Sequence, residues 1–188
     1  MTNHLILVKH SVPEIYGDQP ANTWKLSEEG RSRAQHLAEE LKSFEPDVIL
    51  SSEEPKAKET AEIVASDLGL KMQMFPDLHE HDRSNVPYLS HDAFQASMRD
   101  FFQEPDQLVF GRETANQVYA RVYQAIHHIL NEYRNKTVVI VTHGTVISLF
   151  VSRLTGSSDF ELWTKIGLPS FIAMDLHSNT LIVRENVV

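Results

Sequence analysis

Short apolar runs that alternate with amphipathic segments are the feature that most constrains how this chain of 188 residues folds. The runs at residues 5–8, 47–50, 137–142 and 170–176 predict buried strands. Residues 180–185 follow the turn signal "HSN", which predicts a hairpin with the strand before it. A weaker strand candidate lies at residues 71–75.

Segments with the pattern of helices lie between these runs. They span residues 27–43, 55–68, 113–134 and 145–154. The first opens with a serine cap and early acids, and the second opens with proline at a first-turn position. Because strands alternate with helices, the sequence predicts an α/β fold, a three-layer α/β/α sandwich around a mainly parallel sheet.

The length favours one domain with a sizeable core, and a hydrophobic content of 41% is that of an ordinary folded protein. We therefore expect a single domain over residues 1–188. Residues 76–110 interrupt the alternation with proline, aspartate, histidine and phenylalanine. We interpret this stretch as a cap-like insertion near one end of the sheet.

Charge and composition exclude several classes of function. The net charge of −9 argues against a nucleic-acid binder, which needs a basic face, but a few local cations still allow a small anionic substrate. The absence of cysteine excludes disulfides, thiolate nucleophiles and zinc–sulfur sites. The N-terminal apolar run is too short for a signal peptide, and no segment approaches the roughly 20 apolar residues of a membrane span. We therefore expect a cytoplasmic protein with no membrane partner.

Titratable side chains follow three of the predicted strands. Lys9 and His10 come after the first strand, Lys56 opens the helix after the second, and His143 follows the strand at 137–142. Ligands of open α/β sheets bind beyond the carboxyl ends of the strands, where helix N-termini add backbone donors, so this edge suits a phosphoryl group. A histidine after a strand is also a common turn residue, and a first-turn lysine is usually solvated. The pattern alone leaves both interpretations open.

The segment "LILVKHS" resembles the "LxLVRHG" signature of the histidine phosphatase superfamily, the phosphoglycerate-mutase-like enzymes. The segment "SSEEPKAKETAEIVASDLGL" resembles "SSPLxRAxeTAxiiaexLgL", and "GRETANQVYARV" resembles "GESxxxvxxRv". Further matches lie at residues 25–41, 77–80 and 138–147, in the order of the family. The resemblance covers nearly the whole chain and implies a phosphoglycerate-mutase-like fold. The compact length is similar to the shorter phosphatase branch.

The resemblance implies three catalytic roles. His10 would be the nucleophile that becomes phosphorylated, since neutral imidazole, with an unperturbed pKa of about 6.5, is a competent nucleophile. His143 would bind the transferring phosphoryl oxygens. Glu80 would donate a proton to the leaving alkoxide and then take one from the attacking water, which requires a raised pKa. A solvated loop acid is the other interpretation of Glu80.

The chain departs from the family pattern at the positions that bind phosphate. Lys9 and Lys56 stand where the family has two arginines, so both positive charges remain while the planar fork of each guanidinium is lost. Ser11 replaces a glycine, and Tyr16 falls near a position that is often polar. Arg83 could supply a replacement guanidinium or be a solvated surface residue.

Two further groups of residues leave their roles open. His79 and His81 flank Glu80 and suggest a metal site, but the helical HExxH spacing is lacking, so we expect no metal and no cofactor. Phe101, Phe102 and Trp163 could cover the pocket, pack inside or form the interface of a homodimer.

We hypothesise a metal-independent phosphatase that hydrolyses a small phosphomonoester through a phosphohistidine at His10. The expected partner is thus a small phosphorylated substrate and not a nucleic acid. A phosphoglycerate-type mutase is the enzymatic alternative. A weak or inactive module that binds phosphate esters is the alternative from another class, because both clamp arginines are replaced. We favour an active enzyme, since His10, Glu80 and His143 all remain.

Overall fold

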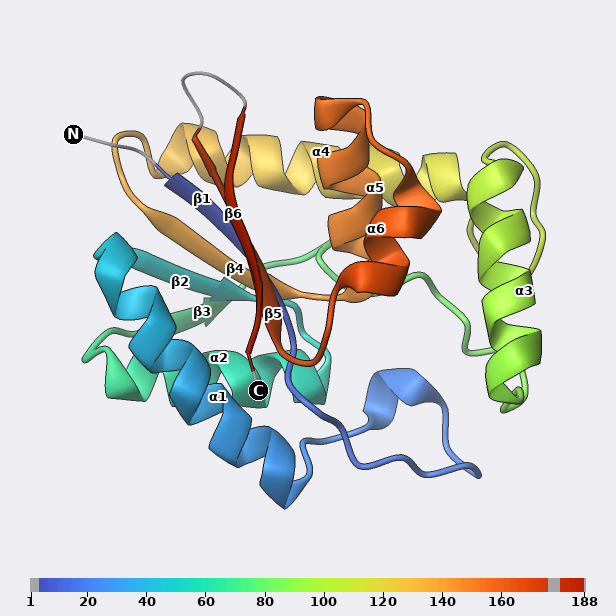
Figure 1. Ribbon diagram of the computed structural model, residues 1–188, viewed down its shortest axis with the longest axis horizontal. Helices are drawn as coiled ribbons and strands as arrows, with labels where there is room; N and C mark the ends of the chain where they lie inside the picture. Colours follow the sequence, from blue (N-terminus) through green and yellow to red (C-terminus); the bar gives the residue numbers. More distant parts are fainter. Residues whose placement is uncertain (1–3, 176–179, 188) are drawn as a thin grey trace.

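The computed structural model describes residues 4–175 and 180–187, which contain one six-stranded sheet (Figure 1). Its strand order is β3-β2-β4-β1-β5-β6. The strands are β1 (His4–Lys9), β2 (Val48–Ser51), β3 (Met72–Met74), β4 (Val138–Thr142), β5 (Ser170–Asp175) and β6 (Thr180–Asn186). The weaker candidate at 71–75 is thus confirmed as the short strand β3.

The sheet is mainly parallel, as predicted. Strands β3, β2, β4 and β1 are parallel to one another, whereas β5 is antiparallel to β1 and to β6. The pairing of β5 with β6 confirms the predicted hairpin, while its turn signal at 177–179 lies outside the described residues. The parallel pairs bring the carboxyl ends of β1, β2 and β4 to one edge of the sheet.

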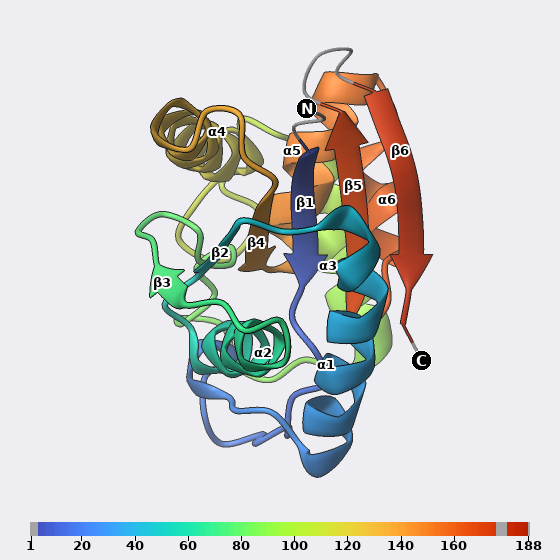
Figure 2. The same ribbon diagram turned by 90° about the vertical axis from the view of Figure 1, so that its left-hand side faces the viewer.

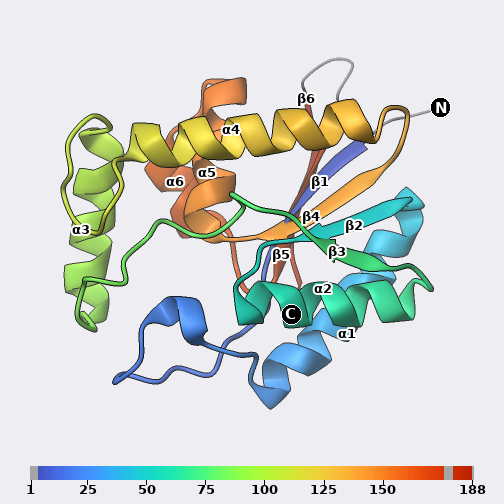
Figure 3. The same cartoon turned by 180° about the vertical axis from the view of Figure 1, so that it is seen from behind.

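Helices cover both faces of the sheet, which gives the three predicted layers (Figure 2). Helices α1 (Glu28–Leu41) and α2 (Pro55–Asp67) lie on one face, and α4 (Ala115–Glu132) and α5 (Gly144–Thr155) lie on the other. Seen from behind, α4 runs across the strands toward α3 (His91–Gln103) (Figure 3). Helix α6 (Asp159–Lys165) and two short 3₁₀ helices, η1 (Ala21–Thr23) and η2 (Lys42–Phe44), complete the described elements.

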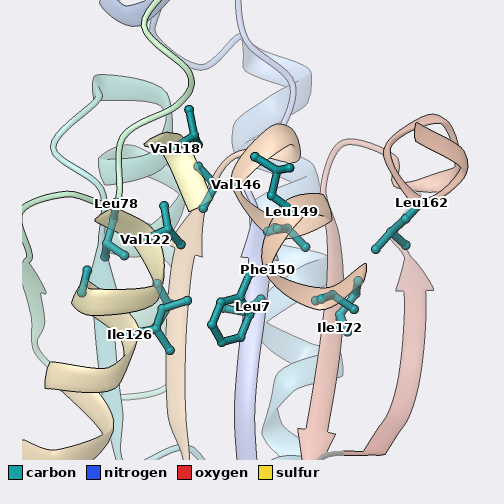
Figure 4. Close-up of a cluster of buried hydrophobic side chains, with 14 of the residues drawn as sticks. Leu7, Leu78, Val118, Val122, Ile126, Val146, Leu149, Phe150, Leu162 and Ile172 are labelled. Carbon is teal, nitrogen blue, oxygen red and sulfur yellow. The ribbon is translucent and has the colours of Figure 1, made fainter. Parts of the chain in front are cut away.

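The strand β1 is apolar on both sides because both faces of the sheet are covered. Ile6 and Val8 belong to the core under α1 and α2, whereas Leu5 and Leu7 belong to the core under α4 and α5 (Figure 4). Successive side chains of a strand point to opposite faces, so this run packs two cores at once. His10 therefore follows a strand that is fixed from both sides.

The structure contains two helices that the sequence patterns did not indicate, α3 and α6. Ser90 caps α3 by accepting a hydrogen bond from the backbone N–H of Ala93. Phe101 and Phe102 are buried in the core on the α4 side, and Trp163 of α6 packs against that core. Of the three roles left open for these aromatic residues, packing inside is the one that the structure supports.

Candidate active site

His10 lies directly after β1, with its ring buried and its tautomer fixed by the backbone. Its backbone N–H donates to the carbonyl of Thr142 at 3.0 Å, which continues the pairing with β4. Its Nδ1 lies 2.8 Å from the carbonyl oxygen of Ser11. Because a carbonyl oxygen only accepts, Nδ1 carries the proton and Nε2 keeps its lone pair. Burial, together with the charges of His143 and Lys56, holds the pKa of His10 well below its usual value.

His143 lies beside His10, at the end of the neighbouring strand. The two ring centroids are 5.2 Å apart, with the ring planes at 64°. His143 Nε2 is 2.9 Å from the Ser52 hydroxyl and 3.6 Å from Glu54 Oε1. Burial and the nearby ammonium of Lys56 lower the pKa of His143 well below its usual value. The structure thus brings together the two histidines that the sequence singled out.

Glu80 reaches the same region from the loop after β3. One carboxylate oxygen accepts from the backbone N–H of His81 at 2.9 Å, and the other accepts from that of Thr145, on the first turn of α5, at 3.3 Å. Burial favours a raised pKa for Glu80, but the charges of Arg83 and His143 and the His81 N–H outweigh it, so the pKa is lowered. Without substrate, the carboxyl group of Glu80 therefore lacks the raised pKa that a proton donor needs. A phosphoryl dianion nearby would raise it by like-charge repulsion.

A partly buried network of hydrogen bonds holds the loop that carries Glu80. The guanidinium of Arg121, on α4, donates to the carbonyls of Asp77, His79 and Glu80 at 3.0, 2.8 and 3.0 Å. It also makes two bonds to the carboxylate of Glu113, at 2.7 and 2.9 Å. Such a bidentate contact fixes the orientation of the guanidinium as well as its distance from the carboxylate. Arg121 and Glu113 both lie in the segment "GRETANQVYARV", but the sequence patterns did not indicate that they hold the Glu80 loop in place.

Both lysines of the expected phosphate clamp already bind protein acceptors. The Nζ of Lys9 donates to the Ile166 carbonyl at 2.9 Å, and burial lowers the pKa of Lys9 to about 8 despite the opposing charge of Glu80. The Nζ of Lys56 donates to the Ala21 carbonyl at 2.7 Å and to the Glu54 carboxylate at 2.5 Å. Glu54, whose carboxylate pairs with Lys56, was not among the site residues predicted from the sequence.

The other predicted binding residues lie in different surroundings. Ser11 is buried, and its backbone N–H donates to Thr60 Oγ1 at 3.0 Å. The hydroxyl of Tyr16 donates to Glu14 on an exposed loop. Arg83 is half-buried and lines the cavity described below. Its guanidinium lies 4.9 Å from the ring centroid of Phe94, and its charge lowers the pKa of Glu80.

A cavity of about 370 Å³ lies over this edge of the sheet. Its charged lining residues include Glu53, Glu54, Lys56, Glu80, Asp82 and Arg83. The rings of His10 and His143 are not part of the lining, and Glu54 connects the cavity to His143. This volume is in the range of small-molecule sites. Of the predicted site residues, Lys56, Glu80 and Arg83 therefore face one cavity, while Lys9 is directed to Ile166.

The histidines that flank Glu80 do not gather as metal ligands. His81 is stacked on Phe101, with ring centroids 4.4 Å apart, and burial lowers the pKa of His81 to about 4. Within residues 4–175 and 180–187, no group of three or more potential ligand side chains is placed to hold a metal ion. In the same ranges, no helix combines the length and apolar character that crossing a membrane requires.

The buried neutral histidines predict a specific pH dependence of stability. Unfolding restores an ordinary pKa near 6.5, so below that pH the unfolded chain binds protons that the folded protein does not. The free energy of unfolding should thus fall as the pH decreases from 6.5 to 5. In urea titrations, His10→Asn should reduce this slope by on the order of 1 kcal/mol per pH unit. His128→Asn, which changes an exposed histidine, should keep the slope of the wild type. Equal slopes in all three proteins would show that His10 is not held neutral.

Comparison with known proteins identifies relatives over most of the chain. Residues 5–184 match the model of the histidine phosphatase superfamily (branch 1). The chain is 28% identical over 131 residues to the uncharacterized phosphatase PhoE of Bacillus subtilis (strain 168), a match that covers 70% of this chain and 65% of that protein. It is 28% identical over 171 residues to phosphoserine phosphatase 1 of Hydrogenobacter thermophilus, which covers 85% of this chain and 80% of that protein.

The fold also has counterparts among solved structures. The phosphoserine phosphatase of Entamoeba histolytica, crystallised with 3-phosphoglyceric acid, matches with a TM-score of 0.81 at 18% identity and covers 98% of both chains. That likeness establishes the fold. The chain spans just under two thirds of the length of the Bacillus relative. Since the family model accounts for residues 5–184, this chain belongs to the histidine phosphatase superfamily.

Proposed function

We propose that the protein hydrolyses a small phosphomonoester through a phosphohistidine intermediate at His10, without a metal ion. The observation that carries this proposal is the contact of His10 Nδ1 with the Ser11 carbonyl oxygen at 2.8 Å, which places the ring proton on Nδ1, in buried surroundings that lower the pKa of the ring. This state leaves Nε2 as a nucleophile beside a second histidine.

The first chemical step is attack of His10 Nε2 on the phosphorus atom. The P–N bond forms, the ester P–O bond breaks, and the leaving oxygen takes a proton from Glu80. Charge that builds on the phosphoryl oxygens is stabilised by His143, by Arg83 and by the ammonium groups of Lys9 and Lys56, the first of which also acts on the charges of His10 and Glu80. The Ser11 carbonyl, which accepts from Nδ1, stabilises the positive charge that the ring acquires.

The second step transfers the phosphoryl group to water. Glu80, now ionised, takes a proton from the attacking water, the new P–O bond forms and the P–N bond to His10 breaks. The repulsion between the phosphoryl dianion and the carboxylate raises the pKa of Glu80 while substrate is bound. We thus assign the proton transfers to Glu80 in the complex, where its charge state differs from that of the free site.

The substrate that we propose is a phosphomonoester with a small leaving group. The names of relatives support a phosphatase, since one is a phosphoserine phosphatase and another is described as an uncharacterized phosphatase. The segment 76–110 carries Glu80, Arg83 and α3, and we propose that it acts as a cap over the cavity within a single domain. A second candidate function is phosphate-ester binding without turnover. It is favoured by one observation, the engagement of Lys9 and Lys56 by protein acceptors.

The test of this function is the activity of purified protein on an aryl phosphate and a panel of phosphometabolites, with EDTA present. We expect turnover that His10→Ala reduces by about 10³-fold or more, because the nucleophile is lost. His128→Ala, which removes an exposed histidine from α4, should keep the activity of the wild type. Turnover that needs a metal ion would contradict the metal-free mechanism. Phosphate-ester binding without turnover would favour the binding function.

The pKa of Lys9 predicts the alkaline side of the pH–rate profile. Because this pKa is about 8, Lys9 loses its charge above that pH, and kcat/KM should fall there. Lys9→Arg keeps the charge, so the mutant should stay active and the fall should move to higher pH. Lys58→Arg, at an exposed position of α2, should leave the profile unchanged. An unshifted fall in Lys9→Arg would show that another group causes it.

A further inference from the structure

Glu54 is a buried acid that none of the steps above uses. It occupies the N-cap position of α2, yet its side chain makes no capping hydrogen bond to that helix. Only 8% of the residue is exposed, and it lines the cavity. An uncapped helix start and a buried carboxylate are both costly unless other contacts compensate. The contacts that the Glu54 carboxylate makes must therefore compensate for these two costs.

The partners of Glu54 are groups that bind phosphate in other sites. Its Oε2 lies 2.5 Å from the ammonium of Lys56, and its Oε1 accepts the backbone N–H of Glu80 at 2.8 Å. The same Oε1 lies 3.6 Å from Nε2 of His143. An ammonium, a backbone N–H and an imidazole are typical donors to phosphoryl oxygens. The carboxylate thus binds two of the donors that an incoming phosphoryl group would need and lies near the third, whose Nε2 contacts the Ser52 hydroxyl at 2.9 Å.

We propose that Glu54 determines how tightly the site holds a phosphoryl group, by acting as an internal counter-ion that competes for Lys56 and His143. This inference rests on the proposed function, because it takes the cavity to be the phosphate site. A phosphoryl group must displace the carboxylate from Lys56 or bind beside it. Either route weakens binding, since like charges in a poorly solvated site repel strongly.

Removal of the carboxylate has two linked consequences. Lys56 keeps its bond to the Ala21 carbonyl but loses its counter-charge, which destabilises a buried ammonium. A phosphate ion can then supply the missing charge, so it binds more tightly and stabilises the folded protein more than it stabilises the wild type. A purely structural role of Glu54 predicts the opposite effect, because disorder in Lys56 and in the Glu80 loop would weaken phosphate binding.

The experiment measures binding of inorganic phosphate by calorimetry at fixed pH and ionic strength. We expect the dissociation constant to decrease by at least about tenfold in both Glu54→Gln and Glu54→Leu. The glutamine variant keeps an acceptor for the Glu80 N–H, so it decides the result if the leucine variant does not fold. The matched control is Glu62→Gln, which removes the same charge from an exposed ion pair of α2 and should change affinity less than about twofold.

The outcomes separate this inference from the proposed function. If wild type binds phosphate and the folded Glu54 variants bind it equally or more weakly, Glu54 is not a competing counter-ion, while the phosphate site stands. If Glu62→Gln tightens binding as much as Glu54→Gln, the effect is one of net charge and the inference is also overturned. If no protein in the series binds phosphate, the phosphate site itself is wrong and both proposals fail.

Discussion

The parallel pairing of β1 with β4 is the constraint on which the candidate site depends. Lys9 is paired with Thr142, so the next residue of each strand, His10 and His143, leaves the sheet at the same edge. The backbone bond from His10 to Thr142 extends this register by one residue. Because β1 and β4 are packed in the cores on both faces, the backbone positions that carry the two histidines are fixed relative to each other. The distance between the two histidines is thus a property of the sheet.

The charges around these rings are balanced within the protein. Lys56 is paired with Glu54, and Lys9 donates a hydrogen bond to the Ile166 carbonyl at the end of α6. The mobile ammonium of lysine makes such internal contacts possible, whereas the planar fork of arginine favours two parallel bonds to one anion. The two lysines therefore keep positive charge near the histidines, while protein acceptors bind both ammonium groups.

Much of the fold and the centre of the site was predictable from the sequence. The alternation of apolar runs with amphipathic segments predicted the layers, and the positions of His10 and His143 after strands predicted that they meet at one edge. Helix α3 was missed, although Phe94, Met98, Phe101 and Phe102 have helical spacing, because the surrounding prolines, aspartates and histidines resemble a loop.

The partners of the charged side chains were not predictable. Glu54 lies in a polar stretch next to Lys56 in the sequence, but its contacts with Glu80 and His143 join segments that are 26 and 89 positions away. Arg121 likewise binds carbonyls of a loop some 41 to 44 residues earlier. Such contacts depend on the packed fold. The lowered pKa of Glu80 arises in the same way, from Arg83 and His143 against burial.

In the mechanism that we propose, His10 becomes covalently phosphorylated. The most direct measurement is mass spectrometry of Glu80→Gln protein quenched during turnover of an aryl phosphate under conditions that preserve phosphohistidine. An aryloxide leaves without a proton from Glu80, whereas hydrolysis of the intermediate still needs the base that this variant lacks, so the phosphorylated protein should accumulate. We expect a phosphoryl group on the peptide that contains His10. Turnover with no phosphorylated peptide, or with the phosphoryl group on another residue, would contradict it.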